Sequence, residues 1–303
     1  MTDRDRQLET AQGRLLDRFA PDLLVRRVRW SNGETQVFEL GQGKPVLLVH
    51  GGLDNAFSWA PILPGLARDH RVIAVDLPGH GLADAFAFRR EGFQDHLRGF
   101  LGEILDALEL PTVDLVANSI GALYALELAL STPERVSKLV LVGAPAGASR
   151  PGAPLPLRLL ALPAVGRRLG RRLMSKPTRE GNRTFWGQIL VAHPEKLDDA
   201  QLDADVASQL RNIDSHLDLI GCVADAGGVR RRLLLGDRWR LLQMPILILW
   251  GERDAFAPPE VGDALAAANP QIRVVRIPDA GHLPWFDDPD RIVNELEGFL
   301  ATV

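Results

Sequence analysis

The stretch Val113-Asp114-Leu115-Val116-Ala117-Asn118-Ser119-Ile120-Gly121-Ala122 decides the fold of this chain. Four of the six residues from 113 to 118 are apolar, which is typical of a buried strand, and residues 121–126 have the composition of a buried helix. A strand, a serine and a helix in direct succession indicate a nucleophile elbow, whose tight turn needs small residues two positions before and two positions after the serine. Ala117 and Gly121 occupy these positions, with alanine in place of the first glycine of the usual Gly-x-Ser-x-Gly pattern. Because a serine that caps an ordinary helix gives the same local pattern, the rest of the chain must decide.

Length and composition are those of a globular protein with a large core. The chain has 303 residues, of which 46% are hydrophobic and 24% charged, and its formal net charge is -4. This balance does not indicate binding to nucleic acid or to a membrane surface. No run reaches the ~18 apolar residues that a membrane span needs, and residues 1–9 lack the apolar segment of a secretory signal. The single cysteine, Cys222, cannot form a disulfide within the chain, and we expect a cytoplasmic protein without a metal site or an organic cofactor.

Apolar runs of strand length alternate with helical patterns in the first half of the chain and again near its end. The first two strands flank Ser31-Asn32-Gly33-Glu34, which contains the Asn-Gly turn signal of a hairpin. The later runs alternate as βαβ units do, which predicts an α/β fold with a mostly parallel eight-stranded sheet flanked by helices. We predict strands over residues 25–30, 35–40, 46–49, 71–77, 113–118, 138–142, 245–250 and 272–277, and helices over residues 5–19, 57–66, 92–108, 258–268 and 289–300.

The alternation is interrupted after the sixth strand. Between residues 146 and 242 no long β-rich run occurs, and short helices are predicted over residues 157–174, 179–193, 198–214 and 215–235. A helical block between two sheet strands predicts a cap over the carboxyl edge of the sheet, where the ligands of open α/β sheets bind. We therefore expect a core of residues 1–145 and 243–303 and a helical cap, or lid, of residues 146–242.

Two later loops supply the groups that a serine nucleophile needs. A serine hydroxyl is a weak nucleophile unless a histidine accepts its proton and an acid orients that histidine. In a fold with a nucleophile elbow, the order along the chain is Ser, then Asp or Glu, then His. Asp254 follows the seventh predicted strand and His282 the eighth, so both lie with Ser119 at the carboxyl ends of strands. Glu252 is the alternative acid, but it lies closer to the end of its strand.

Together these motifs make the chain similar to the α/β-hydrolase superfamily, and within it to capped serine hydrolases that use no cofactor. The resemblance covers about residues 25–145 and 243–303, and it rests on His50-Gly51-Gly52, Asp76-x-Pro-Gly-His-Gly81, Asn118-Ser119-x-Gly121, Gly251-x-x-Asp254 and Gly281-His282. It implies a catalytic triad of Ser119, His282 and Asp254. It also implies an oxyanion hole made by the backbone amides of Gly52 and Ile120.

The resemblance implies hydrolysis of a carboxylic ester through an acyl-enzyme, and the apolar candidate contacts given below predict a small-molecule substrate with a hydrophobic acyl group. The alternative is a carbon–carbon bond hydrolase that acts on a vinylogous diketone ring-fission product, since enzymes of that kind share the Asn-Ser-x-Gly elbow. A non-catalytic binding protein on the same fold is a third class. A homodimer is compatible with the sequence. The candidate substrate contacts either are apolar or adjoin the motifs: Leu53, Asn118, Phe185, Trp186, Phe256 and Leu283.

Arginines are concentrated in the predicted cap. Their side chains could hold the carboxylate of a ring-fission product, because guanidinium groups bind carboxylates in a bidentate manner. The alternative, which we favour, is a solvated helix face. The six arginines in question are Arg167, Arg168, Arg171, Arg172, Arg179 and Arg183.

Overall fold

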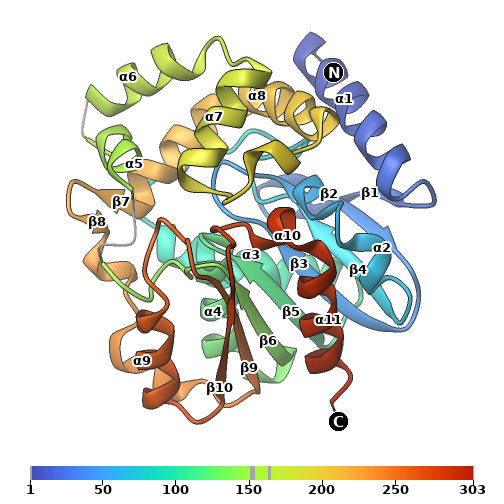
Figure 1. The fold of residues 1–303 in the computed structure, drawn as a ribbon, viewed down its shortest axis with the longest axis vertical. Coiled ribbons are helices and arrows are strands. Elements are labelled where there is room, and N and C mark those ends of the chain that lie inside the picture. Colours follow the sequence, from blue (N-terminus) through green and yellow to red (C-terminus); the bar gives the residue numbers. More distant parts are fainter. Residues whose placement is uncertain (1, 151–153, 163–164, 303) are drawn as a thin grey trace.

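A mostly parallel sheet forms the centre of the structure (Figure 1). The computed structural model describes residues 2–150, 154–162 and 165–302. Within these residues the sheet has eight strands, in the spatial order β1-β2-β4-β3-β5-β6-β9-β10. β2 is antiparallel to β1 and to β4, and the other neighbouring strands are parallel. The predicted fold class is confirmed. The strands are β1 (Leu24–Trp30), β2 (Gly33–Leu40), β3 (Lys44–Val49), β4 (His70–Val75), β5 (Val113–Asn118), β6 (Val136–Val142), β9 (Ile246–Gly251) and β10 (Ile272–Ile277).

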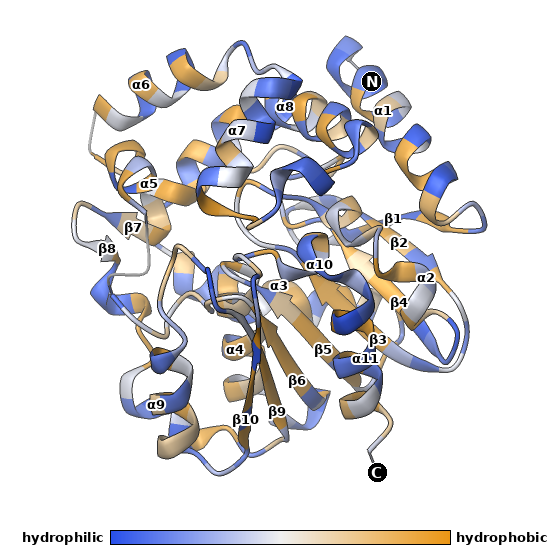
Figure 2. Ribbon diagram, viewed as in Figure 1, coloured by the Kyte–Doolittle hydropathy of each residue, from blue (hydrophilic) through white to orange (hydrophobic). Residues whose placement is uncertain are grey.

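The sheet is buried on both faces, because successive side chains of a strand point to opposite sides. In β3, Leu47 and Val49 pack into the core that includes α3 and α4, whereas Val46 and Leu48 pack into the core that includes α2 and α11. Figure 2 shows the apolar residues concentrated on the central strands, with hydrophilic residues on the outer helices. The helices that connect successive strands of the sheet include α2 (Leu63–Leu66), α3 (Phe93–Ala107), α4 (Gly121–Ser131) and α9 (Glu260–Ala268), and α10 (Pro284–Asp287) and α11 (Pro289–Leu300) follow the last strand.

A group of helices lies between β6 and β9 in the sequence and above one end of the sheet in Figure 1. A hairpin of two very short strands, which the sequence analysis does not predict, and two 3-10 turns connect the last of these helices to β9. The elements are α5 (Leu155–Leu160), α6 (Val165–Met174), α7 (Arg179–Ile189), α8 (Asp199–Val223), β7 (Ala224–Asp225), β8 (Gly228–Val229), η4 (Arg231–Leu233) and η5 (Gly236–Leu241).

The structure differs from the predicted helices in three places. The predicted break between Asp214 and Ser215 is wrong, because both residues lie inside the 25-residue helix α8, which packs against α1, α5, α6 and α7. The predicted helix 57–66 is divided into a 3-10 turn at Ala56–Trp59 and the short helix α2, since the prolines in this segment lack the amide hydrogen that a continuous helix needs. The predicted helix 157–174 is also two helices, α5 and α6, and its residues 163–164 lie outside the described part of the chain.

The N-terminal helix α1 (Asp3–Phe19), which the sequence predicts over residues 5–19, packs along α8. The guanidinium Nε of Arg211 donates to Asp5 at 2.6 Å, and Arg4 donates to the carbonyl of Leu210 at 2.8 Å. α1 therefore fixes the middle of α8 from outside. In the described ranges, no helix is long and apolar enough to cross a membrane.

Candidate active site

Ser119 lies at the turn between β5 and α4, where the backbone is strained. Its φ angle is 50°, in the left-handed region that residues other than glycine rarely adopt. A Cβ atom at Gly121 would lie 2.4 Å from the carbonyl oxygen of His50, so this position requires glycine. Ala117 is fully buried within β5 and has no positive φ, so alanine is accommodated at the position where the usual motif has glycine.

Asp254 and His282 lie in direct contact below the helices of the 155–223 segment. The Nδ1 atom of His282 lies 2.8 Å from Oδ2 of Asp254, and both side chains are buried. The carboxylate also accepts hydrogen bonds from the amides of Ala144 and Phe256, each at 2.8 Å. These two amides fix the carboxylate. Because the carboxylate accepts a hydrogen bond from Nδ1–H of His282, the proton of the imidazole is on Nδ1 and the lone pair is on Nε2.

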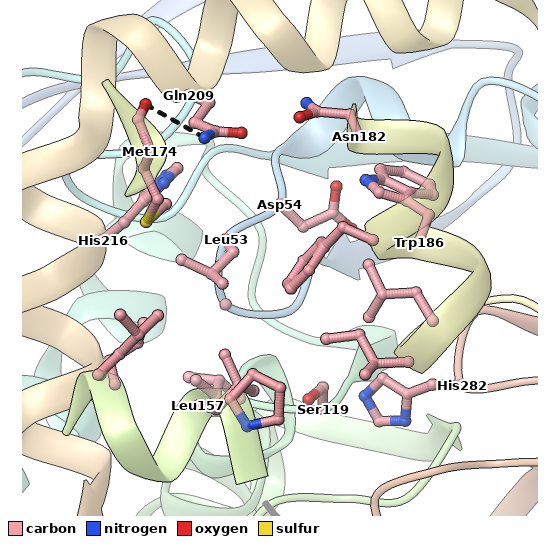
Figure 3. A pocket seen from close by; sticks show the side chains of 18 of the residues that line it. Leu53, Asp54, Ser119, Leu157, Met174, Asn182, Trp186, Gln209, His216 and His282 are labelled. Carbon is pink, nitrogen blue, oxygen red and sulfur yellow. Dashed lines mark hydrogen bonds between the residues drawn. The ribbon is translucent and has the colours of Figure 1, made fainter. Parts of the chain in front are cut away.

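The free nitrogen of His282 faces the cavity that contains Ser119. Nε2 forms no hydrogen bond with any residue of the described ranges, and Ser119 and His282 line the same cavity. Figure 3 draws the Ser119 hydroxyl next to the imidazole ring. The ring of Phe256 stacks on the imidazole with a centroid separation of 3.8 Å and an interplanar angle of 21°. The structure thus places Ser119 and His282 on the lining of one cavity, with Asp254 hydrogen-bonded to the imidazole from the other side.

Two residues that hold the histidine loop have roles that sequence reasoning misses. The side-chain amide of Asn118, expected to contact substrate, donates to the carbonyls of Val142 at 2.7 Å and of His282 at 3.3 Å. Asn118 also lines the cavity. The carboxylate of Asp287 accepts from the amides of Gly281 at 2.8 Å and His193 at 2.8 Å. Because Asp287 follows the motif in an unremarkable Phe-Asp-Asp-Pro segment, no sequence signal identified it.

The two amides expected to form an oxyanion hole lie at the cavity floor. Gly52 and Ile120 both line the cavity, and a Cβ at Gly52 would lie 2.4 Å from Cδ1 of Ile120, so the two loops are in contact. Neither amide donates a hydrogen bond to another group in the described part of the chain. His50 anchors this loop: its Nε2 accepts from the amide of Leu77 at 2.9 Å, and its Nδ1 donates to the carbonyl of Gly51 at 2.7 Å.

The cavity has a volume of about 500 Å³ and lies between the sheet loops and the helices α5 to α8. Most of its lining side chains are apolar, and they include five of the sequence-predicted contacts: Leu53, Phe185, Trp186, Phe256 and Leu283. In Figure 3, Ser119 and His282 lie at one end, and Asp54, Asn182 and Gln209 lie towards the opposite end.

The arginines of α6 and α7 do not reach the cavity. Among the described residues that line it there is no arginine, and Lys176 is the only lysine. Arg171 pairs with Asp214 at 2.6 Å, and Arg179 pairs with Asp203 at 2.7 Å, both on the outer side of α8. The structure therefore agrees with the solvated helix face.

Burial perturbs several ionisable groups around the cavity. It raises the pKa of Asp54 to about 8 and of Asp205 to about 7, and it lowers the pKa of His216 well below its usual value. All three side chains line the cavity. In the described ranges, no group of three or more His, Cys, Asp or Glu side chains is arranged to hold a metal ion.

Comparison with known proteins identifies the family. The family model described as alpha/beta hydrolase fold matches residues 44–289. The chain belongs to the α/β-hydrolase family. It is 30% identical to a 2-hydroxy-6-oxononadienedioate/2-hydroxy-6-oxononatrienedioate hydrolase of Klebsiella pneumoniae, over 87% of this chain and 89% of that protein.

Solved structures with the same fold include enzymes of two activities. The crystal structure of the carboxylesterase CesB of Bacillus subtilis aligns with a TM-score of 0.77 and 19% identity, over 99% of each chain. The 2-hydroxy-6-oxo-6-phenylhexa-2,4-dienoate hydrolase of Rhodococcus sp. strain RHA1 aligns with a TM-score of 0.73 and 22% identity, over 93% of this chain and 99% of that one. At these identities the likeness to the two solved structures concerns the fold alone, and the assignment to the class of α/β-hydrolase enzymes rests on the family match.

Proposed function

We propose that this α/β-hydrolase cleaves a carboxylic ester through an acyl-enzyme, with Ser119 as nucleophile, His282 as general base and acid, and Asp254 as the group that orients His282. The observation that carries the proposal is the hydrogen bond of 2.8 Å between His282 Nδ1 and Asp254, with Nε2 directed into the cavity of Ser119. Nucleophilic catalysis by serine needs such an acid–histidine pair with its free nitrogen available to the serine hydroxyl.

The reaction has two steps with one histidine. Ser119 Oγ attacks the ester carbonyl carbon while His282 Nε2 takes the hydroxyl proton, and Asp254 stabilises the imidazolium through Nδ1–H. The tetrahedral intermediate expels the alcohol, which receives the proton from Nε2. Water then attacks the acyl-enzyme in the same way, with its proton passing through Nε2 to Ser119 as the acid leaves.

The amides of Gly52 and Ile120 stabilise the oxyanion of both tetrahedral intermediates. Preorganised N–H donors of this kind are worth ~3–4 kcal/mol of transition-state stabilisation each. The support for these donors is their place at the cavity floor next to Ser119 and the absence of another acceptor for them within the described residues.

We also propose that residues 146–242 act as a cap over a core formed by residues 1–145 and 243–303. The cavity supports this division, because its floor comes from the loops after β3, β5, β6 and β10 and its other walls come from α5 to α8. The wall residues from α5 and α6 are mainly leucines, which favours a hydrophobic acyl group.

A carbon–carbon bond hydrolase is the second candidate. It is favoured by the sequence relatives, of which the Klebsiella pneumoniae protein carries the name of a dienedioate hydrolase. A dioate has two carboxylates, and burying them requires paired cations. Since no arginine is found among the described lining residues and Lys176 is exposed, the cavity favours the ester.

The two candidates are separated by steady-state hydrolysis of p-nitrophenyl esters from acetate to dodecanoate, with a dienedioate ring-fission product as competing substrate. We expect a kcat/KM that peaks at one ester chain length and falls by at least about 10³-fold in Ser119→Ala. An Asp214→Asn variant, which removes an exposed carboxylate outside the cavity, serves as the control. Turnover of the ring-fission product alone would reject the ester and select the second candidate.

A further inference from the structure

The cavity has a second polar region away from Ser119. Asp54, from the loop after β3, and Asp205, from α8, both line the cavity. In Figure 3 the carboxylate of Asp54 points away from Ser119 and towards Asn182 and Trp186 of α7. The proposed mechanism uses none of these groups.

Asp54 is buried without a hydrogen-bond partner of ordinary geometry. Asp54 is 6% exposed, and neither of its carboxylate oxygens forms a hydrogen bond with any other described residue. The hydroxyl of Ser58 and the amide of Asn55 favour its ionised form, but desolvation outweighs them and raises the pKa of Asp54 to about 8. A buried carboxyl that serves only the fold is normally satisfied by donors of the fold. Asp54 is an exception that needs an explanation.

Asp205 adds a second carboxyl group to the same end of the cavity. It is 5% exposed, and its Oδ2 accepts from Asn182 Nδ2 at 2.6 Å and from Trp186 Nε1 at 3.1 Å. Repulsion by Asp205 contributes to the raised pKa of Asp54, so the two carboxyl groups lie within each other's field. Asn182 and Trp186 hold Asp205 in place and leave Asp54 facing the cavity.

No cation in the described part of the chain balances these carboxyl groups. No basic side chain is among the causes of the pKa of Asp54 or of Asp205, and Lys176, the only basic residue besides histidine among the described residues that line the cavity, is exposed. Trp186 and Phe185 line the cavity too, and aromatic faces attract cations. Two buried carboxyl groups beside aromatic rings, without an internal cation, are complementary to a ligand that brings the positive charge.

We propose that Asp54 and Asp205 bind a positively charged nitrogen of the substrate, so that the preferred esters carry a protonated or quaternary amine. This inference rests on the proposed function only in naming the substrate an ester. The binding of the cation does not depend on the chemistry at Ser119. Because the cation pairs with an ionised Asp54, its binding becomes tighter as the pH rises towards alkaline values.

The test measures binding by calorimetry to the Ser119→Ala protein, with two matched alcohols. One carries a trimethylammonio group at the end of its chain, and the other carries a tert-butyl group of the same shape. We expect the cation to bind about tenfold more tightly than its neutral isostere, a preference that Asp54→Asn or Asp205→Asn reduces to about one. Asp214→Asn is the control, since this aspartate of α8 pairs with Arg171 outside the cavity.

The outcomes separate this inference from the proposed function. Equal binding of the two alcohols, or a preference that both Asp54→Asn and Asp205→Asn retain, would overturn the cation site. The same pair of end groups is then placed in the acyl chain, and separately in the alcohol, of ester substrates for the active enzyme. Ester turnover without preference for the cation would leave the hydrolase and reject the site. Cation binding without turnover of any ester would leave the site and reject the hydrolase.

Discussion

Replacing Asp54 by asparagine should stabilise the protein, and the gain should grow with pH. The parent side chain is buried at the cavity wall, and burial raises its pKa from 3.8 to about 8. Asp205 and Asp76, which face it from α8 and from the turn after β4, oppose its ionisation further. Asparagine has nearly the same shape but does not titrate, so only the ionisation is removed.

The direction of the pH dependence follows from the protons that the folded and unfolded states bind. Between about pH 4 and pH 8 the folded protein keeps a proton on Asp54 that the unfolded chain has released, so the free energy of unfolding falls as the pH rises through this window. One pKa unit corresponds to about 1.4 kcal/mol. Between about pH 5 and about pH 8, the free energy of unfolding of Asp54→Asn should therefore rise by roughly 4 kcal/mol relative to that of the parent.

Urea denaturation of parent and variant at both pH values measures this difference. The other buried carboxyl groups change the stability of parent and variant alike, so they largely cancel in the comparison. The control is Asp214→Asn, an exposed substitution whose effect should stay within about 0.5 kcal/mol at both pH values. Parallel pH profiles of Asp54→Asn and the parent, within about 1 kcal/mol, would refute the argument that Asp54 is held protonated by burial.

Three further substitutions test the elbow and the acid. Asp254→Asn should reduce kcat by about 10³- to 10⁴-fold in ester assays, because the amide favours the wrong tautomer of His282, and a loss below tenfold would argue against the proposed role. Gly121→Ala should lower the free energy of unfolding by about 2–4 kcal/mol in urea, since its Cβ meets the carbonyl of His50 at 2.4 Å, and a neutral effect would contradict the required glycine. Ala117→Gly should cost about 1 kcal/mol of stability and change kcat/KM by less than about threefold, whereas a large gain in activity would mean that alanine impairs the elbow.

The sequence predicts the fold and the meeting of Ser119, Asp254 and His282 for one physical reason. Each residue follows a strand of apolar residues, and the carboxyl ends of parallel strands meet at one edge of a sheet. The chain order of the three residues then matches the one arrangement that a nucleophile elbow uses. Local patterns were therefore sufficient to place groups that are far apart in the sequence.

The second polar end of the cavity could not be predicted in this way. Asp54 belongs to a loop where a polar residue is expected, and Asp205 and Asn182 lie on helices whose sequences show no motif. Their proximity depends on how α7 and α8 pack above the sheet, which is a property of tertiary contacts. The same limit explains α8, where the polar pair Asp214-Ser215 resembles a helix boundary although packing on several sides keeps the helix continuous.

The most direct measurement is active-site labelling with a fluorophosphonate, followed by intact-mass and peptide mass spectrometry. The proposed mechanism predicts one label per folded chain, attached to Ser119, because the same Oγ that attacks an ester attacks phosphorus when His282 takes its proton. Labelling should be slowed by at least about 10³-fold in His282→Ala and absent from heat-unfolded protein. A folded parent that remains unlabelled, or a label on another residue, would contradict the assignment of Ser119 as the nucleophile.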